Sequence, residues 1–373
     1  MLEIKDWITS PTFPGDEEKN DPRPTAPHHI AQRHVILGNC HRGQLFHINR
    51  HLAFALTLSI VALCACAPAA APTRALTPVT VQLRWTHNAQ FAGMYAAEQK
   101  GYYAAEGLAV TFVEGSGNLD FIQPVLDGNA QFSITNADSL VLARAENKPV
   151  RAIATIYRRS PTVYLTLAES GIKKPQDFVG KRIRAVPAST PMLHTMMARV
   201  GIAQNQYTEV NVAATLTPLY SGEVQVSAGF VTNEVLTAQA AGYKLNIIYP
   251  DDYGIHFYAD TIFTTDDLVA KNADLVRRFL RATLKGWTYA IENPAQVGAL
   301  VQKYNVTADA ALENAKMAAS IPLVNTGEDY IGWMKPEIWA GMEKILREQG
   351  VLTKPVDVTQ VYTMEFLKEI YGK

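Results

Sequence analysis

The sequence predicts an α/β protein of two lobes with a hinge and a helical C-terminal tail. Three observations predict it: strands alternate with helices from Val79 onward, a second such run begins near residue 165, and the last third is helical. A chain of 373 residues that is 48% hydrophobic can form about two domains. The expected parts are a leader and lipoprotein signal segment (1–66), a flexible tether (67–78), lobe 1 (79–164 and 260–373) and lobe 2 (165–259).

In the first lobe, extended and helical segments follow one another in the order βαβαβαβ. Val81 and Leu83 alternate with polar residues in the first strand, and the first helix turns at Gly107. The expected strands are PVTVQLRW, LAVTFVEG, AQFSIT and VRAIATIY, and the expected helices are FAGMYAAEQKGYYAAEG, NLDFIQPVLDGN and ADSLVLARAEN. This order predicts a mostly parallel sheet with helices on both faces.

The second lobe repeats the pattern, with helices that end at Gly201 and Gly242. Its expected strands are GKRIRAV, YTEVNV, VQVSAGF and KLNIIYP, and its helical segments are TPMLHTMMARVG, TPLYSGE and NEVLTAQAAG. The extended segments TVYLTLAE and GIHFYADTIFTT flank this lobe, and the second of them can carry the chain back to the first lobe. The tail opens with NADLVRRFLRATLKGWTYAIENP, whose apolar residues recur at helical spacing.

Charge and cysteine content exclude several classes of function. Lys and Arg number 34 against 35 Asp and Glu, without a basic block, which argues against a nucleic-acid partner. Cysteine occurs only at Cys40, Cys64 and Cys66, so a zinc site, a disulfide framework and a cysteine nucleophile are excluded from the main body. No Ser–His–Asp or paired-carboxylate arrangement is visible either. We therefore expect no catalytic residue, metal or cofactor, and a binding protein rather than an enzyme.

The segment before the body resembles a bacterial lipoprotein signal. The apolar run 52–63 has the length of a signal core and is too short to span a bilayer. It leads into Leu63-Cys64-Ala65-Cys66, in which Ala65 supplies the small residue before cleavage and Cys66 is the expected lipidation site. APAAAPTRALTP then reads as a flexible tether. The expected location is the extracytoplasmic face of the cell membrane, with the lipid as anchor; an ordinary buried helix is the alternative.

Two α/β lobes joined by two crossing strands, with a helical tail, form the plan of a type II periplasmic binding protein. Such a fold binds its ligand between the lobes, at the C-terminal ends of strands and the N-terminal ends of helices. Trp85 and Asn88 stand where the first strand ends. The indole can stack on a flat ligand, and the Asn88 amide can donate and accept hydrogen bonds at its edge. A buried core tryptophan and a turn asparagine are the alternative.

Other candidates occupy equivalent junctions. Asn136 and Asp138 end one strand and start a helix, and Ser189 stands at a helix N-terminus in the second lobe, where free N–H groups favour an acceptor oxygen. Helix capping explains all three equally well. Tyr157 lies near the expected hinge, where a role in the cleft is possible.

Several blocks resemble the thiamine-pyrimidine-precursor binding family and its relatives for sulfonates and nitrate. These blocks are LRWTHNAQFAGMYAAEQKGYYAAEGLAV, NAQFSITNADSLVLARAENKPVRAIATI and IKKPQDFVGKRI. The likeness covers roughly residues 79–300 and implies the two-lobed fold and a role in ABC import. It implies partners as well: a small-molecule ligand, a permease and an ATPase, with the binding protein itself a monomer.

The resemblance also assigns ligand contacts. Within the family the tryptophan and asparagine after the first strand touch the ligand ring, which implies Trp85 and Asn88. A tyrosine on the next helix corresponds to Tyr95, and an asparagine–glutamate pair in the second lobe corresponds to Asn233 and Glu234. For Glu234 the alternative is a solvated first-turn residue favoured by the helix dipole.

Two departures from the family pattern bear on the ligand. The usual proline before the asparagine is His87, and a histidine common in thiamine members is Phe91, which becomes a further candidate contact. The exchange of a polar group for a ring favours a larger flat ligand, with riboflavin first. A thiamine pyrimidine precursor (formylaminopyrimidine or hydroxymethylpyrimidine) or a sulfonate is the alternative. Fungal relatives are pyrimidine-synthesis enzymes that carry a Cys-rich iron-binding motif, and the body has no cysteine for it.

Overall fold

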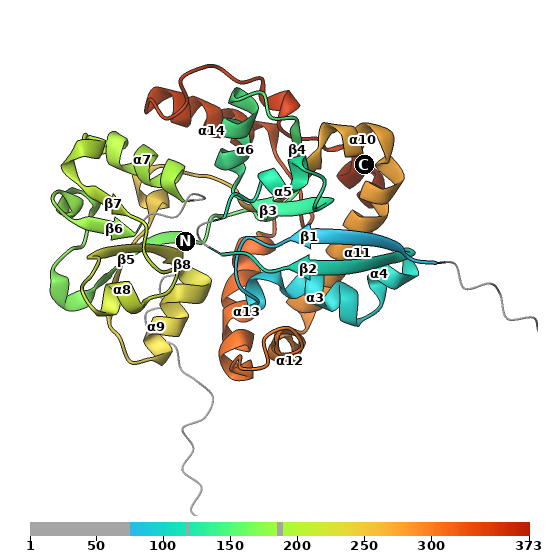
Figure 1. Cartoon of the computed structure of the whole chain (residues 1–373), viewed down its shortest axis with the longest axis horizontal. Coiled ribbons are helices and arrows are strands. Elements are labelled where there is room, and N and C mark those ends of the chain that lie inside the picture. Colours follow the sequence, from blue (N-terminus) through green and yellow to red (C-terminus); the bar gives the residue numbers. More distant parts are fainter. Residues whose placement is uncertain (1–74, 117–118, 185–188) are drawn as a thin grey trace, which may run out of the picture. The chain divides into compact units, whose positions relative to one another are not determined.

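The computed structural model describes residues 75–116, 119–184 and 189–373 (Figure 1). The leader, the expected lipidation site Cys66 and residues 67–74 of the expected tether lie outside these residues, and the last two tether residues, Thr77 and Pro78, belong to the first strand. The described chain forms two five-stranded sheets, each accompanied by helices. Within it, no helix combines the length and the apolar character needed to cross a membrane.

The first sheet has the strand order β2-β1-β3-β10-β4. β1 pairs in parallel with β2 and β3, whereas β10 pairs antiparallel with both β3 and β4. The four strands of the first lobe therefore run in one direction, as predicted, with one reversed strand inserted among them. The strands are β1 (Thr77–Gln82), β2 (Leu108–Val113), β3 (Phe132–Thr135), β4 (Val150–Tyr157) and β10 (Ala259–Thr265).

The second sheet repeats this plan in the order β7-β6-β8-β5-β9. β6 pairs in parallel with β7 and β8, and β5 pairs antiparallel with β8 and β9. Each of the two reversed strands is one that the chain enters on crossing between the sheets. The strands are β5 (Thr162–Leu167), β6 (Arg182–Arg184), β7 (Thr208–Val210), β8 (Val226–Phe230) and β9 (Leu245–Ile248).

The crossing strands fix where the chain changes sheets. The predicted boundary between residues 164 and 165 falls inside β5, which belongs to the second sheet along its whole length. The return occurs before β10, whose first residue is Ala259, one residue ahead of the predicted boundary. TVYLTLAE is thus the first strand of the second sheet and not the last of the first.

Helices follow the strands in both units and make up most of the tail (Figure 1). In the first unit they are α3 (Ala92–Gln99), α4 (Tyr102–Ala105), α5 (Gln123–Leu126) and α6 (Ala137–Ala145). In the second they are α7 (Thr190–Arg199), α8 (Thr217–Tyr220) and α9 (Leu236–Ala240). The tail contains α10 (Asp266–Lys271), α11 (Ala273–Glu292), α12 (Val297–Gln302), α13 (Ala310–Val324), α14 (Pro336–Glu348) and α15 (Glu365–Tyr371).

The contact between α3 and α11 explains the small residues in the first helix. Trp287 of α11 is fully buried, and a Cβ added to Gly93 would lie 2.2 Å from its Cγ. A Cβ on Gly286 would in turn lie 2.0 Å from the carbonyl oxygen of Gly93. Two helix backbones can approach this closely only where side chains are absent. The tail helix α11 is thereby held against the segment that follows Trp85.

Candidate functional site

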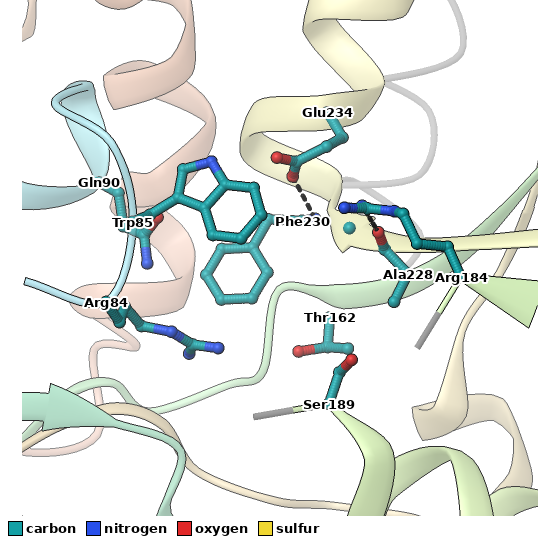
Figure 2. A pocket seen from close by; sticks show the side chains of 10 residues that line it. Arg84, Trp85, Gln90, Thr162, Arg184, Ser189, Ala228, Phe230 and Glu234 are labelled. Carbon is teal, nitrogen blue, oxygen red and sulfur yellow. Dashed lines mark hydrogen bonds between the residues drawn. The ribbon is translucent and has the colours of Figure 1, made fainter. Parts of the chain in front are cut away.

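A pocket with a cavity volume of about 40 Å³, partly open to solvent, is lined by residues of both sheet units (Figure 2). The first unit contributes side chains that follow β1, and the second contributes side chains from the ends of β6 and β8 and from the segments next to them. The lining residues are Arg84, Trp85, Gln90, Thr162, Arg184, Ser189, Ala228, Gly229, Phe230 and Glu234. Its position is where a sheet of this type binds ligand. The cavity is smaller than small-molecule sites usually are, so a vitamin-sized ligand would enter only if the two units moved apart.

Asp260 organises the wall from the first unit. Its Oδ1 lies 2.9 Å from Nη1 of Arg84, and its Oδ2 accepts a hydrogen bond of 2.8 Å from Nε2 of Gln90. Nη1 of Arg84 also donates to Oδ1 of Asn136. Asp260 has a φ of +42°, in the left-handed region that few non-glycine residues occupy. One carboxylate at the start of β10 thus fixes two side chains of the pocket wall.

Two rings face the pocket from opposite units. Trp85 is partly exposed, and Figure 2 shows its indole on the pocket wall beside the segment that carries Arg84. Phe230 ends β8 in the second unit, and the Arg84 guanidinium lies 5.1 Å from the centre of its ring. A cation over an aromatic face is attracted by the ring's quadrupole, so this contact joins the two units.

Arg184 and Glu234 form the wall from the second unit. Arg184 donates from Nε to Oγ of Ser227 at 2.8 Å and from Nη2 to the carbonyl oxygen of Ala228 at 2.5 Å. Burial lowers the pKa of Arg184, and the nearby Glu234 carboxylate opposes that effect. Both groups therefore act as charged elements of one wall.

Glu234 occupies a π-helical turn, Val231–Val235, that follows β8 directly. Its Oε2 accepts from the backbone N–H of Phe230 at 2.7 Å, and its Oε1 accepts from Nδ2 of Asn233 at 2.8 Å. A Cβ on Gly229 would lie 2.8 Å from the Cβ of Glu234. Glycine at this position therefore leaves room for the carboxylate to fold back over the end of β8.

Three of the sequence-predicted residues line the pocket, namely Trp85, Ser189 and Glu234. Ser189 stands at the N-cap position of α7, as expected for that junction. Asn233 lies one residue from the pocket and orients Glu234 through its amide. It lines a neighbouring hollow of about 310 Å³, which shares Arg184 and Glu234 with the pocket.

Asn88, Phe91 and Tyr95 do not line the pocket. Asn88 is buried and caps the short helical turn Ala89–Phe91, where its Oδ1 accepts from the N–H of Gln90 at 2.7 Å. Phe91 and Tyr95 are fully buried core residues. The Tyr95 hydroxyl lies 2.7 Å from Nδ1 of His87, and its ring stacks on Tyr304 at 4.3 Å. Asn88 thus has the turn role that was its alternative, and Phe91 and Tyr95 belong to the core.

The remaining predicted residues lie behind the lining. Asn136 accepts from Arg84, as described above, and stands at the N-cap position of α6. Asp138 is fully buried, and burial raises its pKa to about 7. Its Oδ1 accepts from the N–H of Ser139, and its Oδ2 has no hydrogen-bond partner. Tyr157 is also buried and donates to Oγ of Ser320 at 2.9 Å.

Sequence reasoning missed several lining residues, above all Arg84, Arg184 and Phe230. A signal for the two arginines was present, because each is a charged residue at the end of a buried strand, in VQLRW and in RIRAV. A charge in such a position needs a partner or a ligand. Phe230 carried no comparable signal, since a phenylalanine at a strand end is ordinary core composition.

A wider hollow of about 470 Å³ lies against the segments that connect the sheets. Its charged groups are paired with one another: Arg158 lies 2.6 Å from Asp329, and Lys335 lies 2.9 Å from Glu328. None of the ten predicted contacts lines it. Across the described residues, no group of three or more His, Cys, Asp or Glu side chains is placed to hold a metal ion.

Comparison with known proteins gives matches across the body. Residues 88–297 match the model of the NMT1/THI5-like family. The riboflavin-binding protein RibY of Chloroflexus aurantiacus is 29% identical over 80% of this chain and 91% of its own length. The formylaminopyrimidine-binding protein of Halalkalibacterium halodurans is 29% identical over 64% of this chain and 74% of its own.

A solved structure confirms the predicted fold class. The alkanesulfonate-binding protein SsuA from Xanthomonas axonopodis pv. citri, bound to MOPS, superposes with a TM-score of 0.62 at 12% identity. The match covers 79% of this chain and 99% of that protein. The two α/β units with crossing strands are therefore those of a type II periplasmic binding protein.

Proposed function

Because this chain belongs to the NMT1/THI5-like family, we propose that it is the solute-binding component of an ABC importer and that its ligand is riboflavin. The observation that carries the proposal is the pocket itself, whose walls come from both sheet units and include the rings of Trp85 and Phe230. A planar heteroaromatic solute stacks favourably on such rings, by about 1 kcal/mol for each ring beyond the area it covers. The riboflavin-binding relative, which aligns over most of both chains, supports this choice of ligand.

Binding is expected to proceed by closure of the two units around the ligand. The connections between the sheets are two short segments, which can act as a hinge. Trp85 presents a ring from one unit, and Arg184 and Glu234 present polar groups from the other. Closure would bring both sets onto one ligand, and the closed form would then dock on the permease that its ATPase drives.

The protein is proposed to work as a monomer on the extracytoplasmic face of the cell membrane. Acylation at Cys66 would hold it there, and the Ala/Pro-rich segment between Cys66 and the first strand would serve as a flexible tether. A single acyl chain binds membranes only weakly, so stable anchoring needs the several chains of a lipoprotein cysteine.

A thiamine pyrimidine precursor is the second candidate ligand, favoured by the formylaminopyrimidine-binding relative. Sulfonates come third, because the sulfonate-binding neighbour is similar in fold alone. An enzyme of pyrimidine synthesis would be a function of a different class. Turnover of a substrate by the purified protein, without any ATPase partner, would favour that class over a binding protein.

A ligand screen tests the proposal directly. We expect the purified protein to quench the fluorescence of added riboflavin and to melt at a higher temperature in its presence. Flavin mononucleotide, formylaminopyrimidine, taurine and nitrate complete the panel. Stabilisation by formylaminopyrimidine or taurine without any response to flavin would refute riboflavin as the ligand.

A further inference from the structure

One nitrogen of the Arg184 guanidinium, Nη1 with its two N–H groups, donates to no described residue. Its side chain is almost fully buried, with 1% of the residue exposed. Nε and Nη2 donate to Ser227 and Ala228, whereas Nη1 is buried and has no hydrogen-bond partner among the residues that the structure describes. A buried donor on a charged group is costly when it stays unpaired, and such groups in folded proteins usually have a purpose.

The position of the guanidinium connects this donor with the pocket. Arg184 is one of the lining residues, and Figure 2 shows its guanidinium extending from the end of β6 toward the side where Glu234 and Trp85 lie. Glu234 influences its pKa but forms no ion pair with it within 4 Å, and both Glu234 oxygens accept N–H groups of Phe230 and Asn233. Arg184 therefore lies close to the Glu234 carboxylate, but its Nη1 does not donate to that carboxylate.

The charges around the pocket indicate what kind of acceptor fits. Arg84 is neutralised by Asp260 at 2.9 Å, and the charge of Arg184 is balanced by the nearby Glu234. The two arginines of the lining are thus balanced by Glu234 within the lining and by Asp260 behind it. An anionic group next to Arg184 would also lie next to the Glu234 carboxylate, which would repel it. A neutral acceptor oxygen, such as a ring carbonyl, gains the hydrogen bond without that repulsion.

We propose that Arg184 determines ligand specificity, by donating from Nη1 to a neutral carbonyl oxygen on the heterocyclic edge of the ligand. The inference rests on the proposed function and narrows it: the site selects planar heterocycles with a dione edge, as the pyrimidinedione ring of a flavin has, over heterocycles with an amine at that edge. An amine offers a second donor to Arg184 and leaves Nη1 unpaired. Discrimination of this kind is strong, because the penalty falls on a buried polar group.

Arg184→Met is the central variant, since methionine fills similar space without donors. Arg182→Gln on the same strand is the matched control, because Arg182 is exposed and does not line the pocket. Dissociation constants for riboflavin come from fluorescence quenching of the full-length protein. We expect on the order of a tenfold to hundredfold loss of affinity in Arg184→Met and no change in Arg182→Gln.

Ligand-side substitutions keep the test valid if Arg184→Met folds poorly. In 2-thioriboflavin and 4-thioriboflavin one ring carbonyl oxygen is replaced by sulfur, a weak acceptor. We expect wild-type protein to lose affinity for one of the two, and Arg184→Met to bind that analogue and riboflavin equally. Equal affinity of the wild type for riboflavin and both analogues would overturn the inference while leaving riboflavin as the ligand. Flavin mononucleotide binding more tightly than riboflavin, with the gain lost in Arg184→Met, would overturn it too, because Arg184 would then serve an anion.

Failure of the proposed function gives a separate pattern. If the wild type binds no flavin but binds formylaminopyrimidine, riboflavin is refuted, and the same variant is measured with that ligand and its deformylated amine. A loss of affinity for the formyl compound alone in Arg184→Met would support a carbonyl partner for Arg184. Equal losses of affinity for the formyl compound and the amine would overturn the inference that Arg184 donates to a carbonyl oxygen.

Discussion

Replacing Trp85 with alanine tests whether this tryptophan stacks on the ligand or supports the fold. Trp85 is partly exposed on the pocket wall, so a stacked ligand would cover the exposed part of its indole. Covering about 100 Å² at about 25 cal/mol per Å² contributes roughly 2.5 kcal/mol. Ring stacking adds about 1 kcal/mol. Trp85→Ala should therefore weaken riboflavin binding by about 3.5 kcal/mol, which corresponds to a factor of about 300 in Kd.

The assay is a fluorescence titration with riboflavin, combined with thermal unfolding of the ligand-free protein. Because Trp85 is only partly buried, we expect Tm to fall by no more than a few degrees. Trp287→Ala is the matched control: this tryptophan is fully buried against Gly93, and its truncation should cost about 3–5 kcal/mol of stability. A large fall in Tm for Trp85→Ala with riboflavin affinity retained would show that Trp85 is a core residue and refute the reasoning.

Three further predictions concern packing, pH and anchoring. Gly93→Ala should destabilise the protein by several kcal/mol, because the new methyl group would overlap the Trp287 ring. Urea unfolding measures the loss of stability, and an unchanged midpoint would show that α3 and α11 can separate freely. Asp138 has a folded-state pKa raised to about 7 by burial, so the unfolded chain gives up this proton at lower pH than the folded one. The free energy of unfolding should therefore fall by a few kcal/mol as pH rises from about 4 to 7. Asp138→Asn should remove this contribution to the pH dependence of stability. Identical pH profiles of the two proteins would show that Asp138 does not cause it. Cys66→Ser should move the protein from the membrane fraction to the soluble extracytoplasmic fraction, as followed by fractionation and immunoblotting; an unchanged distribution would argue against lipid anchoring at this residue.

Sequence periodicity predicted the strands and helices of the body well, because each element carries its own local signal. Strand order was harder, since it depends on pairing between distant segments. β10 enters the first sheet between β3 and β4, and β5 enters the second sheet beside β8. Both are extended apolar segments near the hinge, and their sequences do not state which sheet they join. The boundary expected at residue 164 consequently fell inside β5.

The sequence predicted the position of the candidate site better than it predicted the residues that line it. The ends of strands supplied Trp85, and the helix that follows β8 supplied Glu234. The direction of each side chain could not be predicted, and Asn88 illustrates why. Its amide satisfies the N–H of Gln90 in the turn that follows, a local bond that competes with any ligand. Arg184 was overlooked because a basic residue in a short strand usually lies on the surface.

The central claim is that this protein binds a flavin ring in the pocket formed by both sheet units. The most direct measurement is a crystal structure of the full-length protein with riboflavin. The account predicts an isoalloxazine ring stacked on Trp85, with a ring carbonyl oxygen within hydrogen-bond distance of Nη1 of Arg184. A flavin bound elsewhere, or a pocket that stays filled by Phe230 and Arg84 when flavin is in excess, would contradict it.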